Sequence, residues 1–298
     1  MTSNRLSPEA PFDRGLQARH RRRWAGRGMA GARFLYDAAA AELAERLSLV
    51  QRRFAVGLEM NGYDGSLARA VGGQVDFLIR SEREGDWLDG TPLAVVADEE
   101  LLPFANGSLD LVLSCLSLHL TNDTPGVLAQ IQRALRPDGL FLTALLGGDS
   151  LQELRTCLIT AEAELTGGAS PRVPPFVELR DAGALLQRTG FALPVIDQDR
   201  QTVRYDTMFG LMADLRAMGM ANSLTARSRR PLGRRVFLRA AEIYAERFSD
   251  RDGRIRATFD IVYLSGWKPH ESQQKPLRPG SAQVSLADVL TDRSGGRG

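Results

Sequence analysis

The chain has 298 residues, 43% of them hydrophobic and 25% charged, with a net charge of +2. A globular chain of this size buries its own core and needs neither a metal nor a disulfide to stabilise it. The near-zero net charge argues against a general nucleic-acid binder, and no apolar run approaches the roughly 20 residues of a membrane span. We therefore expect a cytoplasmic protein, whose contact with the inner face of the membrane would be peripheral.

The first part of the chain alternates between strand and helix patterns. Residues 1–29 are polar and basic and predict an arm with a short helix. Residues 30–48 are rich in strong helix formers. The elements predicted next are strands 53–59, 75–80, 92–98, 109–119 and 140–147, with helices at 65–71 and 124–137. Such alternation implies crossover connections and a doubly wound, mostly parallel α/β sheet.

After Gly148 the pattern is less regular. The elements predicted there are helices 149–165, 177–190, 206–218 and 231–248, and strands 191–197, 201–205 and 257–268. Asp149 or Ser150 would cap the first of these helices, and Gly190 would end the second. We expect one domain over 30–270, with inserted helices at about 206–250, and a mobile tail over 271–298, which is rich in Gln, Pro, Ser and Gly.

The sequence also contains two cysteines and two arginine clusters. Cys115 and Cys157 lie in apolar surroundings, which favours reduced, buried thiols in a cytosolic protein. The arginine-rich segments 19–27 and 227–235 are typical of solvated helix faces, but they also suit an acidic partner or a membrane surface.

The turn after the first predicted strand has the features of a ligand-binding loop. Glu59 ends the strand, Gly62 and Gly65 lie in the turn, and a helix begins at once. In a parallel sheet, ligands bind beyond the carboxyl ends of the strands, where glycine lets the backbone approach them. The pattern is weak taken alone, and an ordinary strand-to-helix turn fits it equally well.

A second group of acids follows the third predicted strand. Asp98, Glu99 and Glu100 precede the loop that leads to the fourth strand. A carboxylate there can accept a hydrogen bond from an exocyclic amine such as that of adenine. The alternative is a helix N-terminus, whose dipole favours acidic side chains.

The order of these motifs resembles the class I S-adenosylmethionine-dependent methyltransferases, and "LRPDGLFL" at 135–142 matches that class's phrase between a helix and the fifth strand. Six further phrases resemble the NADH dehydrogenase (complex I) assembly factor 5 family: 12–25, 97–104, 116–123, 147–155, 209–222 and 266–282. That family is more distantly similar to the malonyl carrier-protein methyltransferase of biotin synthesis.

The resemblance implies a Rossmann-like class I methyltransferase fold with a helical N-terminal arm and a helical C-terminal insertion. It implies S-adenosylmethionine as cofactor, bound by six residues: Glu59, Asn61, Gly62, Gly65, Asp98 and Glu99. It also implies a protein client, a subunit of complex I, and transfer of a methyl group to it. Two alternatives remain open: arginine hydroxylation of the same client, and an assembly chaperone with little or no catalysis.

Two departures from the family's pattern predict weak cofactor binding. Asn61 replaces the first glycine of the turn, although Asn tolerates a positive φ better than other side chains. Arg80 stands at the predicted end of the second strand, where the family has an acid that binds the ribose hydroxyls. Arginine has only donors and cannot accept from a hydroxyl. Glu82, two residues later, is the alternative acceptor.

The sequence offers one weak catalytic candidate. His119 follows the fourth predicted strand and would titrate near neutral pH, although a structural histidine that caps the strand end fits as well. Asn122 and Asp123 would bind substrate or cap the next helix. His270 has no evident partner. No ligand spacing predicts a metal site, whereas hydroxylation would call for an oxygen-activating metal.

Overall fold

The computed structural model describes residues 10–25, 31–88 and 90–274. Its centre is a seven-stranded sheet in the order β3-β2-β1-β4-β5-β7-β6. Only β7 runs antiparallel to its neighbours. The strands are β1 Phe54–Met60, β2 Val75–Glu82, β3 Ala94–Val96, β4 Leu109–Cys115, β5 Leu135–Leu146, β6 Ala192–Tyr205 and β7 Ile255–Trp267. This confirms the predicted doubly wound, mostly parallel sheet.

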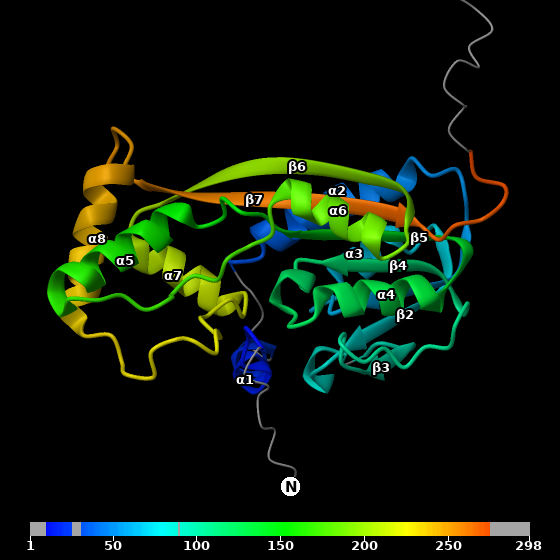
Figure 1. Ribbon diagram of the computed structural model, residues 1–298, viewed down its shortest axis with the longest axis horizontal. Helices are drawn as coiled ribbons and strands as arrows, with labels where there is room; N and C mark the ends of the chain where they lie inside the picture. The colour runs from blue at the N-terminus through cyan, green and yellow to red at the C-terminus, as the bar shows by residue number, and fades with distance from the viewer. Residues whose placement is uncertain (1–9, 26–30, 89, 275–298) are drawn as a thin grey trace, which may run out of the picture.

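Helices cover both faces of the sheet (Figure 1). They are α1 Arg14–Ala25, α2 Phe34–Ser48, α3 Ser66–Val71, α4 Thr124–Ala134, α5 Gln152–Thr166, α6 Leu179–Arg188, α7 Met208–Ala217 and α8 Arg234–Phe248, with 3-10 turns η1 Gly85–Trp87 and η2 Leu118–Leu120. No helix of the described ranges is long and apolar enough to cross a membrane.

The central strand β4 shows why the sheet is buried on both sides. All seven of its residues are buried. Leu111 packs in a core with Leu43 of α2, whereas its neighbour Val112 packs in a second core with Ile131 of α4 and Leu186 of α6. Alternate side chains of a strand point to opposite faces, so an apolar run is the expected pattern here.

Several predicted boundaries were wrong. The two strands predicted at 191–197 and 201–205 are the single strand β6. Strand β4 ends at Cys115 rather than at 119, and η2 follows it. Helix α4 ends at Ala134, so Pro137 lies within β5 instead of ending the helix.

The start of α5 is also different from the prediction. Leu151 holds the cap position with a φ of 57° and no side-chain cap bond. Asp149 instead pairs with Arg200, and the Ser150 hydroxyl donates to the Asp260 carbonyl at 3.1 Å. The predicted glycine at the end of α6 is confirmed, because Gly190 follows the cap residue with a φ of 85°.

The arm is joined to a distant part of the chain. Phe12 forms a bridge with Leu224, and the Asp13 amide donates to the Ser223 carbonyl at 2.8 Å. The Arg227 guanidinium donates to the Asp13 carboxylate at 3.0 Å. The predicted short helix of the arm is α1. Most of the predicted mobile tail lies at 275–298, outside the described residues. Both cysteines are free and buried.

Candidate functional site

The turn between β1 and α3 is built around a buried carboxylate. Glu59 is fully buried and accepts hydrogen bonds from the Ala68 amide at 2.9 Å and from Nε of Arg80 at 2.7 Å. A side chain at Gly62 would overlap the Glu59 carboxyl group. Gly65 has a φ of 75°, and a Cβ there would lie 2.7 Å from Cζ of Arg80. Both glycines are therefore required by the turn.

Two non-glycine residues of the turn also adopt a positive φ. Asn61 has a φ of 49°, as its residue type permits, and Tyr63 has a φ of 51°. The Tyr63 ring is buried and packs edge-on against the rings of Tyr36 and Trp87, with centroids 5.5 and 5.4 Å away. The guanidinium of Arg21 lies 4.2 Å from its centroid. An aromatic ring thus fills the space beside the turn.

The acid at the end of β2 is Glu82, and the expectation that Arg80 ends this strand was wrong. The strand continues for two more residues because Glu82 is fully buried and paired. Arg21 of α1 binds its carboxylate, and the Tyr63 amide donates to it at 2.5 Å. Arg21 also contacts Glu84 at 2.9 Å. Burial raises the pKa of Glu82, and the charge of Arg21 offsets part of that rise.

The acids after β3 are bound by the same helix. Nη2 of Arg14 lies 2.6 Å from carboxylate oxygens of both Asp98 and Glu99, and Nε lies 3.7 Å from Glu100. Arg83 lies 3.6 Å from Asp98. Burial alone would raise the pKa of Asp98, but the Glu100 amide and Arg14 lower it further than burial raises it. No helix begins at these acids, so the helix-terminus alternative was wrong.

Helix α1 therefore closes the edge of the sheet where the predicted cofactor residues meet. The cavity left between Arg14, Gln17 and Arg21 on one side and Asn61 and Tyr63 on the other has a volume of about 10 Å³. That is room for about one water molecule. Ligand pockets for molecules of nucleoside size measure roughly 300 Å³ or more. This cavity, as the described residues line it, does not fit S-adenosylmethionine in this conformation.

Arg14, Arg21 and Tyr63 were not recognised from the sequence. One signal was present: Arg14, Gln17 and Arg21 recur at intervals of three and four, so they share one face of a helix. All three are buried. The sequence could not show that this polar face meets acids more than sixty positions away. Tyr63 had a signal of its own, because a large aromatic residue is unusual within a glycine turn.

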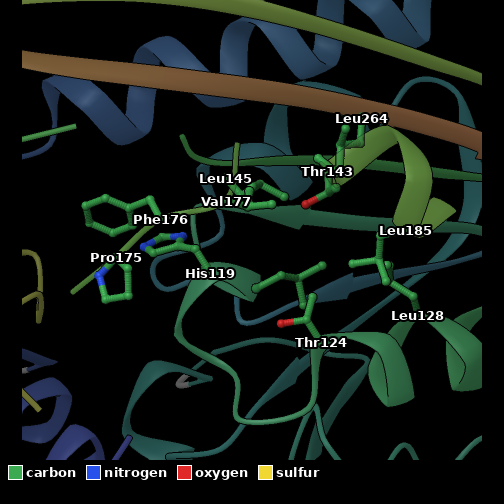
Figure 2. Close-up of a pocket in the computed structure, with 12 residues that line it drawn as sticks. His119, Thr124, Leu128, Thr143, Leu145, Pro175, Phe176, Val177, Leu185 and Leu264 are labelled. Atoms are coloured by element: carbon green, nitrogen blue, oxygen red, sulfur yellow. The ribbon is translucent and has the colours of Figure 1, made fainter. Parts of the chain in front are cut away.

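His119 lies at the wall of a separate, apolar pocket of about 200 Å³ (Figure 2). Its ring meets Phe176 edge-on at 5.7 Å, and the hydroxyls of Thr124 and Thr143 are the other polar groups of the lining. Neither ring nitrogen has a hydrogen-bond partner among the described residues. Burial lowers the pKa of His119 to about 3. The ring is therefore neutral at physiological pH, and the expected titration near pH 7 was wrong.

The turn η2 separates this pocket from the edge closed by α1. Ser117 and Leu120 line the small cavity beneath α1, whereas Leu118 and His119 line the apolar pocket. Of the site residues predicted from the sequence, the fold thus brings together the cofactor group, and His119 lies apart from it. The apolar pocket has no carboxylate in its lining, so it suits an uncharged or apolar ligand.

Asn122 and Asp123 have structural partners. The Asp123 carboxylate accepts from the Gly126 amide at 2.9 Å and caps α4, as one of the two predictions for it required. The Asn122 side chain accepts from the Phe12 amide at 2.8 Å and donates to the Phe12 carbonyl at 3.2 Å. It holds the arm in place.

His270 lies apart from the site, with Nδ1 2.7 Å from the Ser272 hydroxyl. Within residues 10–25, 31–88 and 90–274, no group of three or more His, Cys, Asp or Glu side chains is arranged to hold a metal ion.

The strand order, the glycine turn and the acids at the strand ends define a protein of the class I methyltransferase fold. The methyltransferase domain family matches residues 74–143. A methyltransferase structure from Bacillus halodurans superposes with a TM-score of 0.54 at 15% identity, covering 77% of this chain and 99% of that one. The YcgJ protein of Bacillus subtilis gives 0.53 at 14% identity, covering 76% and 98%. These similarities show the fold alone.

The chain belongs to the arginine-hydroxylase NDUFAF5 family. It is 39% identical to the mitochondrial arginine-hydroxylase NDUFAF5 of Danio rerio, over 93% of this chain and 89% of the relative. The human protein of that name is also 39% identical, over 93% and 83%. The malonyl-[acyl-carrier protein] O-methyltransferase of Laribacter hongkongensis is 40% identical over a shorter part, 63% of this chain and 61% of that protein. The family expected from the sequence is confirmed.

Proposed function

We propose that this protein is an assembly factor of respiratory complex I that acts on a protein client, and that its own arm closes the nucleoside edge of its fold. The 39% identity to NDUFAF5 proteins over 93% of the chain supports the first part. The pairing of Arg14 and Arg21 with the carboxylates after β2 and β3 supports the second.

The cofactor expected from the fold is S-adenosylmethionine. The residues proposed to bind it are Glu59, Asn61, Gly62, Gly65, Asp98 and Glu99, joined by Glu82. In this conformation their carboxylates already have arginine partners. A nucleoside therefore binds only when α1 moves away and its ion pairs break. Because each buried pair is costly to break, we propose that binding is weak.

Transfer of a methyl group to the client is the reaction that the fold suggests. Arginine hydroxylation is the second candidate, and the observation that favours it is the name of the relatives that match nearly the whole chain. The closed edge supports a third outcome, in which the protein acts on its client without catalysis. Methylation of malonyl carrier protein has less support, since that relative matches only 63% of the chain.

The client's mass decides among these reactions. We would delete the gene in its source cell, measure the amount of assembled complex I, and compare the masses of its individual subunits in whole-cell extracts by mass spectrometry. Loss of complex I together with loss of one methyl group from a subunit indicates methyl transfer, and loss of one oxygen atom indicates hydroxylation. Loss of complex I with unchanged subunit masses indicates a chaperone. Normal complex I in the deleted cell contradicts the proposed function.

Isothermal titration with S-adenosylmethionine tests the closed edge. We expect weak binding to the unchanged protein and tighter binding to Arg21→Ala, which frees Glu82. Arg22→Ala is the matched control, because Arg22 is the exposed neighbour on the same helix. Micromolar or tighter binding to the unchanged protein that Arg21→Ala does not alter would contradict a closed edge.

The proposed location of the protein is that of its client. We keep the prediction of a cytoplasmic protein in peripheral contact with the membrane that holds complex I. The named relatives are mitochondrial proteins. Fractionation of the source cell, with and without a high-salt wash of the membranes, tests this location.

A further inference from the structure

Two arginine-rich parts of the chain lie side by side. Residues 14–23 contain five arginines and no acid, and residues 216–235 contain six arginines and no acid. The bridge between Phe12 and Leu224 joins the residues just before the first part to the middle of the second, and a Cβ at Gly219 would lie 3.3 Å from Cγ of Arg21. One face of the molecule therefore carries both.

Most of these arginines make no ion pair with an acid of the described part of the chain. Arg14, Arg21 and Arg227 are paired with acids of the chain. The others are exposed and make no ion pair within the described part of the chain: Arg19, Arg22, Arg23, Arg216, Arg229, Arg230, Arg234 and Arg235. Burial lowers the pKa of His20 on α1, and the charges of Arg23, Arg19 and Arg227 lower it further. These eight arginines thus contribute exposed positive charge that no ion pair of the described residues offsets.

An apolar pocket opens beside this charge. It lies between α5, α7 and the start of α8, which are gathered at one end of the molecule (Figure 1), and has a volume of about 240 Å³. Its walls are mostly apolar: Leu151, Leu154, Leu158, Val173, Met212, Leu215, Leu232 and Phe237. Two arginines also line it. Arg172 is bound to Glu162 at 2.6 Å, whereas Arg216 is exposed and has no carboxylate partner among the described residues.

We propose that this arginine-rimmed pocket binds an acidic segment of the protein client, with one large apolar side chain of that segment seated between α5, α7 and α8. The proposal rests on the proposed function, because it names the surface that the client would occupy. The volume suits it, since an apolar cavity of roughly 150 Å³ already accepts benzene. The unpaired arginines complement carboxylates on either side of that side chain.

The shape of this pocket favours a peptide over a lipid surface as its partner. A protein that lies on a bilayer inserts protruding apolar side chains between the headgroups. Here the apolar side chains of the pocket line a hollow, and exposed arginines project beside it. A hollow requires the partner to supply the protruding group, as a peptide side chain does.

Peptide binding to the full-length protein provides the first test. The probe is a short fluorescein-labelled peptide of glutamates with one central phenylalanine, measured by fluorescence anisotropy. We expect replacement of the phenylalanine by serine to weaken binding about tenfold or more, since burial of a large apolar side chain is lost. A lysine version of the peptide should not bind. Equal binding of the phenylalanine and serine peptides would overturn the proposal.

Variants of the protein separate the pocket from its rim. Arg216→Glu with Arg234→Glu should weaken binding about tenfold in low salt and less at high salt. Arg180→Glu with Arg188→Glu on α6 makes the same change in charge at exposed positions outside the pocket lining and should leave binding unchanged. Ala221→Phe should fill the pocket and weaken binding of the phenylalanine peptide alone. If the Ala221→Phe variant does not fold, Met220→Trp serves as the pocket-filling variant in its place.

Two further outcomes decide against the proposal. Vesicles of equal parts phosphatidylglycerol and phosphatidylcholine could bind the protein through the rim. If A221F leaves vesicle binding intact and no peptide binds, the surface is a membrane contact. If complex I requires the protein but the Arg216→Glu, Arg234→Glu variant restores it fully in deleted cells, the client docks elsewhere. By contrast, normal complex I in deleted cells contradicts the proposed function. The peptide measurements then decide separately whether the pocket binds an acidic segment.

Discussion

Arg80 on β2 and Glu59 on β1 are register partners on adjacent parallel strands, and Nε of Arg80 donates to Oε2 of Glu59 at 2.7 Å. Nη2 of the same guanidinium donates to the Tyr63 carbonyl at 2.6 Å, and Nη1 to the Thr91 hydroxyl at 2.9 Å. One arginine therefore neutralises the buried acid and braces the turn after it.

Arg80→Asp should destabilise the protein. If Arg80 instead occupied the position of the ribose-binding acid, the same change would tighten cofactor binding. Glu59 would lose its cation and face a second carboxylate, at a cost of about 3–5 kcal/mol. Urea unfolding measures this. Arg53→Asp is the control, because Arg53 pairs with Asp76 at the exposed surface and should cost about 1 kcal/mol or less. Equal loss in both variants would show that Arg80 does not brace the turn.

Tyr63→Gly should open the nucleoside edge. It removes the ring that packs on Tyr36 and Trp87 and relaxes a backbone with positive φ. We expect tighter binding of S-adenosylmethionine by isothermal titration, together with a loss of about 3–5 kcal/mol of stability from the cavity. Tyr63→Phe keeps the ring and should leave binding unchanged. If the glycine and phenylalanine variants bind alike, the ring does not obstruct the site.

His119 should make stability depend on pH in the acid range. Its pKa is about 3 in the folded protein and near 6.5 when exposed. Below pH 6.5 the unfolded chain binds a proton that the folded protein does not, so the free energy of unfolding falls as the pH falls towards 3. Between pH 7 and pH 5 the fall is about 2 kcal/mol.

Comparison with His119→Gln isolates this effect, because every other titrating group is common to both proteins. Urea unfolding at pH 7 and pH 5 should show a smaller difference between the two pH values for the glutamine variant. An unchanged difference would mean that the His119 ring is protonated within the fold.

Gly62→Ala tests the packing of the turn. A Cβ at this position would overlap the Glu59 carboxyl group, and the backbone would have to shift. We expect a loss of about 1–3 kcal/mol in urea unfolding. Gly73→Ala is the control, because a Cβ there meets nothing within 4 Å. Similar stability of the two variants would contradict the described turn.

The sequence correctly predicted the structural features that local patterns of residues determine. Apolar strands such as β4 and the glycines of the β1 turn carry their signal within a few residues. Strand β6 was divided in two because Asp197–Gln201 is polar, yet this edge strand pairs only with β7 and keeps its central residues exposed. The end of β2 was missed for another reason. A charged run reads as a loop, and only the cation from α1 allows Glu82 to be buried.

The joining of the arm to residues 223–227 bears on when the protein can complete its fold. Asp13 and Arg227 are 214 positions apart, so the segment that leads into α1 receives this partner only after residue 227 has emerged from the ribosome. Contacts between such distant positions form late, because a long loop must close first. Until then α1 is held at the edge of the sheet by its ion pairs with the carboxylates after β2 and β3. The nascent chain thus passes through an interval in which α1 is attached to this edge by fewer contacts than in the finished fold.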